Sequence, residues 1–164
     1  MKIFVTGGNG FIGSRVVKRS VARGDQVTCL LRETSDTSRL DGVAFERFIG
    51  DVRDATRLTE GLAGHDACIH LASISAWTDM RSDALDAIVL GGTANVLSAC
   101  QANEISRLVH VSSATAINGS SYPRVFDEDA TFELGGTPMR YAIAKHETER
   151  LVNAAVSGGL DAVI

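Results

Sequence analysis

Residues 6–13 read Thr6-Gly7-Gly8-Asn9-Gly10-Phe11-Ile12-Gly13, and this segment indicates which fold to expect. It follows a short apolar run, 3–5, and precedes residues 11–23, whose apolar side chains recur at helical spacing. A glycine loop between a strand and a helix is typical of dinucleotide binding, because it brings backbone N–H groups close to a pyrophosphate at the helix N-terminus. The alternative is a glycine turn without a ligand. The residues expected to contact the dinucleotide are Gly7, Gly10, Phe11, Ile12 and Gly13.

Short apolar runs alternate with longer helix-like segments along the rest of the chain. The strands are expected at 3–5, 26–31, 43–49, 67–71, 107–111 and 161–164, and the helices at 11–23, 54–64, 82–102 and 139–157. Such alternation indicates β-α-β units with right-handed crossovers. We therefore expect an α/β fold of the Rossmann type: a doubly wound parallel sheet with helices on both faces, forming one dinucleotide-binding domain over residues 1–164.

Size and composition narrow the class of protein further. The chain has 164 residues, 45% of them hydrophobic, and a formal net charge of −4, which suits one globular domain and argues against a nucleic-acid partner. No apolar run is long enough to cross a membrane and no signal peptide is evident, so we expect a cytoplasmic protein without a membrane partner. The four histidines show no metal-ligand spacing, so no metal is expected. Three separated cysteines, each in an apolar run, are expected to be buried and unpaired: Cys29, Cys68 and Cys100.

The end of the second predicted strand indicates which dinucleotide is bound. An acidic residue there would hold the ribose 2′-hydroxyl of NAD, but Leu31 is followed by Arg32, with Arg39 further on. A guanidinium pairs with a 2′-phosphate instead, so NADP(H) is the preferred cofactor. Glu33 keeps NAD(H) as an alternative, because a shift of one residue would place a carboxylate at the ribose.

Tyr141 and Lys145 lie four residues apart, on one face of the last predicted helix. A free phenol has a pKa near 10, and a neighbouring ammonium favours its ionised form. The pair can therefore deliver a proton to a carbonyl oxygen as hydride arrives. Ser113, from the end of the fifth predicted strand, could hold the same oxygen.

Together these segments resemble the extended short-chain dehydrogenase/reductases, the NAD-dependent epimerase/dehydratase group. The resemblance covers essentially the whole chain. The matching motifs are residues 6–13, Gly50-Asp51-Val52, His70-Leu71-Ala72-Ser73, Gly92-Thr93-x-Asn95-Val96-Leu97, Val111-Ser112-Ser113-Ala114 and Tyr141-x-x-x-Lys145. The Leu31-Arg32 ending is most similar to the dihydroflavonol-reductase-like branch, whose members generally use NADPH.

The resemblance assigns roles to individual residues. It makes Ser113, Tyr141 and Lys145 the catalytic trio, with Lys145 also holding the nicotinamide ribose. It assigns the remaining cofactor contacts to Asp51 and Val52 beside the adenine, Leu71, Ala72 and Ser73 in the cleft, and Arg32 and Arg39 at the 2′-phosphate. The implied activity is NADP(H)-dependent reduction of a ketone or aldehyde, a small-molecule carbonyl substrate. The alternatives are an NAD-dependent nucleotide-sugar epimerase or dehydratase, and a dinucleotide-binding chain without catalysis.

The chain also departs from this family. Val89 stands where many members have an active-site Asn, which argues mildly against the sugar-modifying chemistry. Members continue for about as long again, so the C-terminal substrate domain is expected to be absent. Helices 82–102 and 139–157 are similar to those that pair subunits, which implies a homodimer. Trp77 is either a substrate platform or a packing residue.

Overall fold

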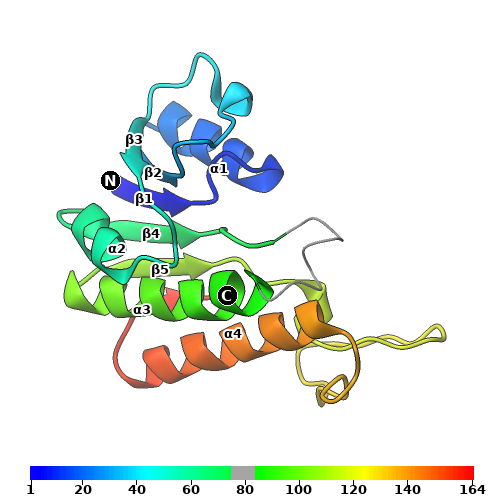
Figure 1. Cartoon of the computed structure of the whole chain (residues 1–164). Coiled ribbons are helices and arrows are strands. Elements are labelled where there is room, and N and C mark those ends of the chain that lie inside the picture. Colours follow the sequence, from blue (N-terminus) through cyan, green and yellow to red (C-terminus); the bar gives the residue numbers. More distant parts are fainter. Residues whose placement is uncertain (75–83) are drawn as a thin grey trace.

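Six parallel strands form one sheet in the order β3-β2-β1-β4-β5-β6 (Figure 1). The computed structural model describes residues 1–74 and 84–164, so Trp77 and Ser82 lie outside the described residues. The strands are β1 Lys2–Thr6, β2 Gln26–Leu31, β3 Glu46–Ile49, β4 Ala67–His70, β5 Arg107–His110 and β6 Ala162–Val163. The helices are α1 Phe11–Ala22, α2 Ala55–Leu62, α3 Gly92–Ala102 and α4 Arg140–Ser157, with short helical turns at Ser38–Leu40, Asp86–Gly91 and Ala114–Ala116. The prediction of a doubly wound Rossmann-type sheet is confirmed.

The alternation of side chains along β1 divides the apolar residues between the two faces of the sheet. Ile3 and Val5 pack in one buried cluster with Val17 of α1, whereas Phe4 belongs to a second cluster with residues of α2, α3 and α4. Successive residues of a strand point to opposite faces, so each face of β1 is covered by its own helices. In Figure 1, α3 and α4 lie together on one side of the sheet and α1 lies near β2.

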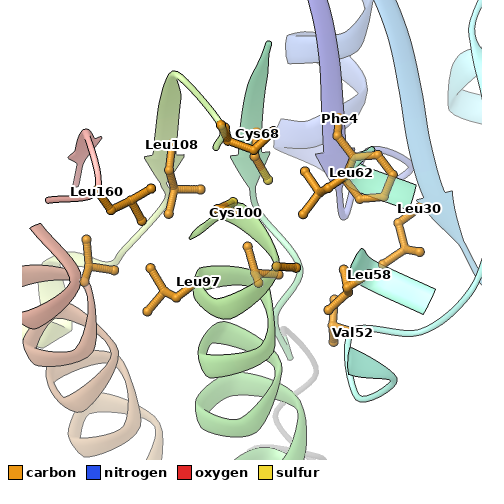
Figure 2. Close-up of a cluster of buried hydrophobic side chains, with 14 residues drawn as sticks. Phe4, Leu30, Val52, Leu58, Leu62, Cys68, Leu97, Cys100, Leu108 and Leu160 are labelled. Carbon is orange, nitrogen blue, oxygen red and sulfur yellow. The ribbon is translucent and has the colours of Figure 1, made fainter. Parts of the chain in front are cut away.

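The larger cluster fills the space between the sheet and α2, α3 and α4 (Figure 2). Phe4, Leu58 and Leu62 are fully buried there, and burial of each such side chain contributes about 1.5–3 kcal/mol relative to exposure. Cys68 and Cys100 are also in this cluster. Cys29 lies in the cluster on the other face, where burial raises the pKa of its thiol to about 12. The cysteines are unpaired and buried, as predicted.

Two elements differ from the sequence prediction by more than two residues. The third strand begins at Glu46 and not at Val43, because the preceding turn at Ser38–Leu40 packs through Leu40 and leaves Val43 in a loop. The helix predicted over 82–102 contains a π-helical turn, Asp86–Gly91, before α3 starts at Gly92. A Cβ atom at Gly92 would lie 2.8 Å from Val52 Cγ2, so close packing explains this interior glycine.

The strand order reverses direction at β1, which pairs with β2 on one side and with β4 on the other. In a parallel sheet the loops after two such strands diverge and leave a crevice at their carboxyl ends, where ligands bind. Here those loops start with Gly7 and Leu71. In the described parts of the chain, no helix combines the length and apolar character needed to cross a bilayer.

Candidate cofactor and catalytic site

A cavity of about 850 Å³ lies at this crevice and is lined by the loops that follow β1, β2, β3, β4 and β5, together with α4. It brings together most of the residues singled out by the sequence. The predicted site residues that line it are Gly7, Gly10, Phe11, Ile12, Gly13, Arg32, Asp51, Val52, Leu71, Ala72, Ser73, Tyr141 and Lys145. Arg39 and Ser113 are not among the lining residues.

The glycine loop lies against the neighbouring strand ends more closely than any side chain would allow. Gly7 has φ +70°, and a Cβ atom there would lie 2.7 Å from the backbone nitrogen of Ala72. A Cβ atom at Gly13 would lie 2.1 Å from the carbonyl oxygen of Gly7. The first N–H groups of α1 have no intrahelical acceptor, and Phe11, Ile12 and Gly13 of this first turn line the cavity beside the loop. This bare backbone cradle fits the pyrophosphate of a dinucleotide.

A buried chain of hydrogen bonds through His70 fixes the glycine loop to β4. The Ala72 N–H donates to Thr6 Oγ1 (3.2 Å), and Thr6 Oγ1 lies 2.7 Å from His70 Nδ1. On the other side of the ring, Nε2 lies 3.1 Å from Thr93 Oγ1, which itself donates to the Val89 carbonyl. Because the Thr93 hydroxyl donates its one proton to the Val89 carbonyl, it can only accept from His70. His70 therefore donates through Nε2 and accepts at Nδ1 from the Thr6 hydroxyl. Burial also holds the pKa of His70 well below its ordinary value, so the ring is neutral.

At one end of the cavity a tight turn after β2 presents a cation and a hydroxyl. The Ser35 N–H donates to the Arg32 carbonyl, and the Arg32 N–H donates to Ser35 Oγ, each at 3.0 Å. Arg32 and Ser35 both line the cavity, whereas Glu33 is exposed and does not. Arg39 is exposed on the turn Ser38–Leu40. The structure therefore does not place Arg39 at this end of the cavity.

A further guanidinium lines this end of the cavity: Arg53, which was not among the residues singled out from the sequence. Its Nε and Nη2 bind the two oxygens of Asp51 at 2.9 and 2.8 Å, and this pairing lowers the pKa of Asp51. Asp51 is thus a carboxylate whose negative charge is balanced by the guanidinium of Arg53. Asn95 of α3 donates to the Val52 carbonyl (3.0 Å) and holds this loop in place. The position of Asn95 in the Gly92-Thr93-x-Asn95 motif was the sequence signal for this contact with the Val52 loop.

At the other end of the cavity Tyr141 and Lys145 lie on one face of α4, as predicted. Lys145 is only 3% exposed, and its Nζ donates to the Val111 carbonyl at 2.8 Å. Burial lowers the pKa of Lys145 to about 8, while the Glu149 carboxylate acts in the opposite direction. Tyr141 packs on the apolar cluster that contains Val89. The pair can place a phenol and a cation at one point of the cavity wall.

The two serines after β5 lie differently. Ser112 lines the cavity, and its hydroxyl donates to Glu149 Oε1. Ser113 caps the turn Ala114–Ala116 by accepting from the Thr115 N–H, and its Oγ lies 2.9 Å from Thr115 Oγ1. The sequence motif places both serines at this end of the sheet but does not distinguish their directions.

Comparison with known proteins assigns the chain and its fold to a family. Residues 3–164 match the family described as NAD dependent epimerase/dehydratase. The chain belongs to this epimerase/dehydratase family. Its curated relatives include a 4-hydroxy-2-methyl-3-oxo-4-farnesyl-3,4-dihydroquinoline-1-oxide ketoreductase of Stigmatella aurantiaca, 31% identical over 100% of this chain and 48% of the relative. A putative dihydroflavonol 4-reductase of Synechocystis is 31% identical over 98% of this chain and 47% of the relative.

Solved structures of the epimerase/dehydratase family share this architecture. The UDP-glucose-4-epimerase of Stenotrophomonas maltophila, solved with bound NAD and formylated UDP-arabinopyranose, superposes with a TM-score of 0.84. It is 26% identical, and the match covers 99% of this chain and 51% of that chain. The chain thus spans about half the length of the relatives it matches. The described residues contain no group of three or more His, Cys, Asp or Glu that could hold a metal ion.

Acidification is expected to destabilise this family member through its buried histidines. Burial lowers the pKa of His110 to about 4, below its ordinary value of 6.5. Between these two values the unfolded chain binds more protons than the folded chain, so the free energy of unfolding falls as pH falls, by about 1 kcal/mol per pH unit for each such histidine. Urea unfolding at pH 7 and pH 5 measures the loss. His110→Gln keeps an N–H donor for Thr148 and should make the dependence shallower by the contribution of His110, while that of His70 remains; an equally steep loss in this variant would contradict the assignment.

Proposed function

We propose that this chain carries the cofactor site and the acid–base residues of an NADP(H)-dependent oxidoreductase that reduces a ketone or aldehyde. The observation that carries the proposal is that one cavity joins the glycine loop, Arg32 and the Tyr141–Lys145 pair. The relatives named as a ketoreductase and a dihydroflavonol 4-reductase support it. The substrate class is a small carbonyl compound.

The preference for NADP(H) over NAD(H) rests on charge at the Arg32 end of the cavity. Arg32 and Arg53 contribute two positive charges there and Asp51 one negative charge, which leaves a net charge of +1. The Ser35 hydroxyl adds a neutral donor. A 2′-phosphate, a dianion near neutral pH, is favoured by this environment. A bare ribose hydroxyl finds no free carboxylate among the described lining residues, because Asp51 is paired and Glu33 lies outside the lining.

The chemistry assigned to the chain is proton transfer. Tyr141 donates its phenolic proton to the carbonyl oxygen, and the Lys145 ammonium stabilises the phenolate that remains. When bound, the nicotinamide supplies the hydride. Lys145 keeps further N–H groups beyond the one bound to Val111, and these can hold the nicotinamide ribose. The Ser113 hydroxyl is the second group that would bind the substrate carbonyl oxygen. To do so, its Oγ must give up its contact with Thr115 Oγ1.

The alternative is an NAD-dependent nucleotide-sugar epimerase or dehydratase. The likeness to the UDP-glucose-4-epimerase structure with bound NAD favours it. The apolar Val89 beside Tyr141 and the cationic Arg32 both disfavour it. A dinucleotide-binding chain without turnover would retain the cradle but give no carbonyl reduction. The proposal further includes a homodimer through α3 and α4, where Leu151 and Val156 are exposed apolar side chains on α4.

Reversing the charge of Arg32 is expected to remove the preference for NADPH. Arg32→Glu should weaken NADPH binding by tenfold or more, about 1.4 kcal/mol, because a carboxylate would then face the 2′-phosphate. NADH binding should change far less. Isothermal titration calorimetry of the chain with each nucleotide measures both affinities.

Arg39 provides the matched control, because it is exposed outside the cavity. Arg39→Glu makes the same charge change at the surface and should weaken NADPH binding by less than about threefold, since exposed charges are screened. A larger effect at Arg39 than at Arg32 would place the 2′-phosphate elsewhere and reject the assignment.

A further inference from the structure

Three consecutive residues at the end of β5 are tied to one face of α4 through side chains. The pairs are His110 with Thr148, Val111 with Lys145, and Ser112 with Glu149. The corresponding distances are 3.2 Å between Nε2 and Oγ1, 2.8 Å between Nζ and the carbonyl oxygen, and 2.5 Å between Oγ and Oε1. Two of these contacts carry charge and reach residues that line the cavity. The helix that supplies Tyr141 is therefore fixed in register on the strand end that supplies the serines.

Glu149 is half-buried behind the cavity wall, whereas Ser112 and Lys145 line the cavity. A carboxylate accepts hydrogen bonds, so the single hydroxyl proton of Ser112 is committed to Glu149. Ser112 then presents only its lone pairs to the cavity. Among the described residues, Tyr141 and Lys145 of the cavity lining and the neighbouring Ser113 carry donors at this end.

The Glu149 carboxylate also acts on the charge of Lys145, as the groups around that amine indicate. His70 of β4 and His110 of β5 are neutral near pH 7, because burial lowers the pKa of each. Asp86, on the π-helical turn packed against α4, is paired with Arg140. Glu149 lies one helical turn after Lys145 on α4, and its negative charge favours the ammonium form of that buried amine.

We propose that Glu149 is a positioning residue of this site: its carboxylate fixes the Ser112 hydroxyl at the cavity wall and places a negative charge one helical turn from the Lys145 amine. Its relevance to catalysis rests on the proposed function, in which Lys145 acts as a cation beside Tyr141. The contacts themselves do not depend on that function, so the two can be tested separately.

The test follows the protonation of Lys145 directly by NMR of the chain labelled with ¹³C at lysine Cε. The chain has three lysines, and Lys145→Arg identifies the signal of Lys145 beside those of Lys2 and Lys18. Glu149→Gln retains an acceptor for the Ser112 hydroxyl but removes the charge. Its Lys145 signal should titrate at a pH lower by about 0.5–1 unit, a three- to tenfold larger acid dissociation constant.

Glu147→Gln is the matched control, because Glu147 lies on the same helix but pairs with Arg150 at the surface. It should leave the Lys145 titration unchanged within about 0.2 unit. Glu149→Asp keeps the charge and should shift the midpoint less than Glu149→Gln does, which provides a second variant if the glutamine variant fails to fold. An unchanged midpoint in Glu149→Gln, or an equal shift in Glu147→Gln or Glu149→Asp, would overturn the proposal. A shifted midpoint in a chain that binds NADH as tightly as NADPH would instead reject the proposed function and leave the positioning role intact.

Discussion

Tyr141→Phe is expected to lower the rate of carbonyl reduction by about two to four orders of magnitude. The substitution removes one oxygen atom and with it the proton that the phenol would deliver. Tyr141 lines the cavity one helical turn before Lys145, whose cation favours release of that proton. The aromatic ring remains, so the packing against the Val89 cluster is retained. NADPH affinity should therefore stay within about twofold.

Steady-state rates with NADPH and a set of simple ketones and aldehydes measure the loss, and calorimetry measures the affinity. Tyr122→Phe is the matched control, because Tyr122 is the other tyrosine of the chain and is 64% exposed on a loop outside the cavity. It should leave the rate unchanged. An undiminished rate in Tyr141→Phe would remove Tyr141 from the mechanism. A parallel loss of NADPH binding would show that Tyr141 acts in binding and not in proton transfer.

Gly13→Ala is expected to abolish measurable NADPH binding, with an affinity loss of at least about a hundredfold, or roughly 3 kcal/mol. A Cβ atom at Gly13 would lie 2.1 Å from the carbonyl oxygen of Gly7, which is backbone and cannot turn aside. Helix α1 would have to move away from β1, and the cradle of N–H groups would open. The free energy of unfolding should also fall, by about 1–3 kcal/mol, because overpacking displaces the surrounding chain.

Gly135→Ala is the control for the glycine-to-alanine change itself, because nothing lies within 4 Å of a Cβ atom at Gly135. It should leave both stability and NADPH affinity near those of the unchanged chain. Calorimetry and urea unfolding of the two variants provide the comparison. Binding of NADPH to Gly13→Ala at the original affinity would contradict the role assigned to the glycine loop.

The fold and the two ends of the site could be predicted because local patterns determine them. The glycines between Val5 and Phe11 determine the tight turn from strand to helix. The alternation of strands and helices leads to a parallel sheet whose strand order reverses at one point, where the crevice forms. Tyr141 and Lys145 share a face because of the helical repeat alone. The same repeat places Glu149 after Lys145, and this spacing was the available signal for it.

The residues that were missed depend on contacts between distant segments. Arg53 reaches the Arg32 end because Leu31 of β2 pairs with Ile49 of β3, which brings the loops after both strands together. Arg39 is closer to Arg32 in sequence, but the turn that packs through Leu40 leaves it exposed outside the cavity. No pattern in the sequence reports these two outcomes, since they follow from strand pairing and from which side chain the turn buries.

Calorimetric titration of the unmodified chain with NADPH and with NADH tests whether this cavity binds NADP(H) through its 2′-phosphate. We expect NADPH to bind at least about tenfold more tightly, a difference of about 1.4 kcal/mol, because the charges of Arg32 and Arg53 outweigh that of Asp51. Equal or tighter binding of NADH would rule out this mode of binding and favour the epimerase or dehydratase alternative.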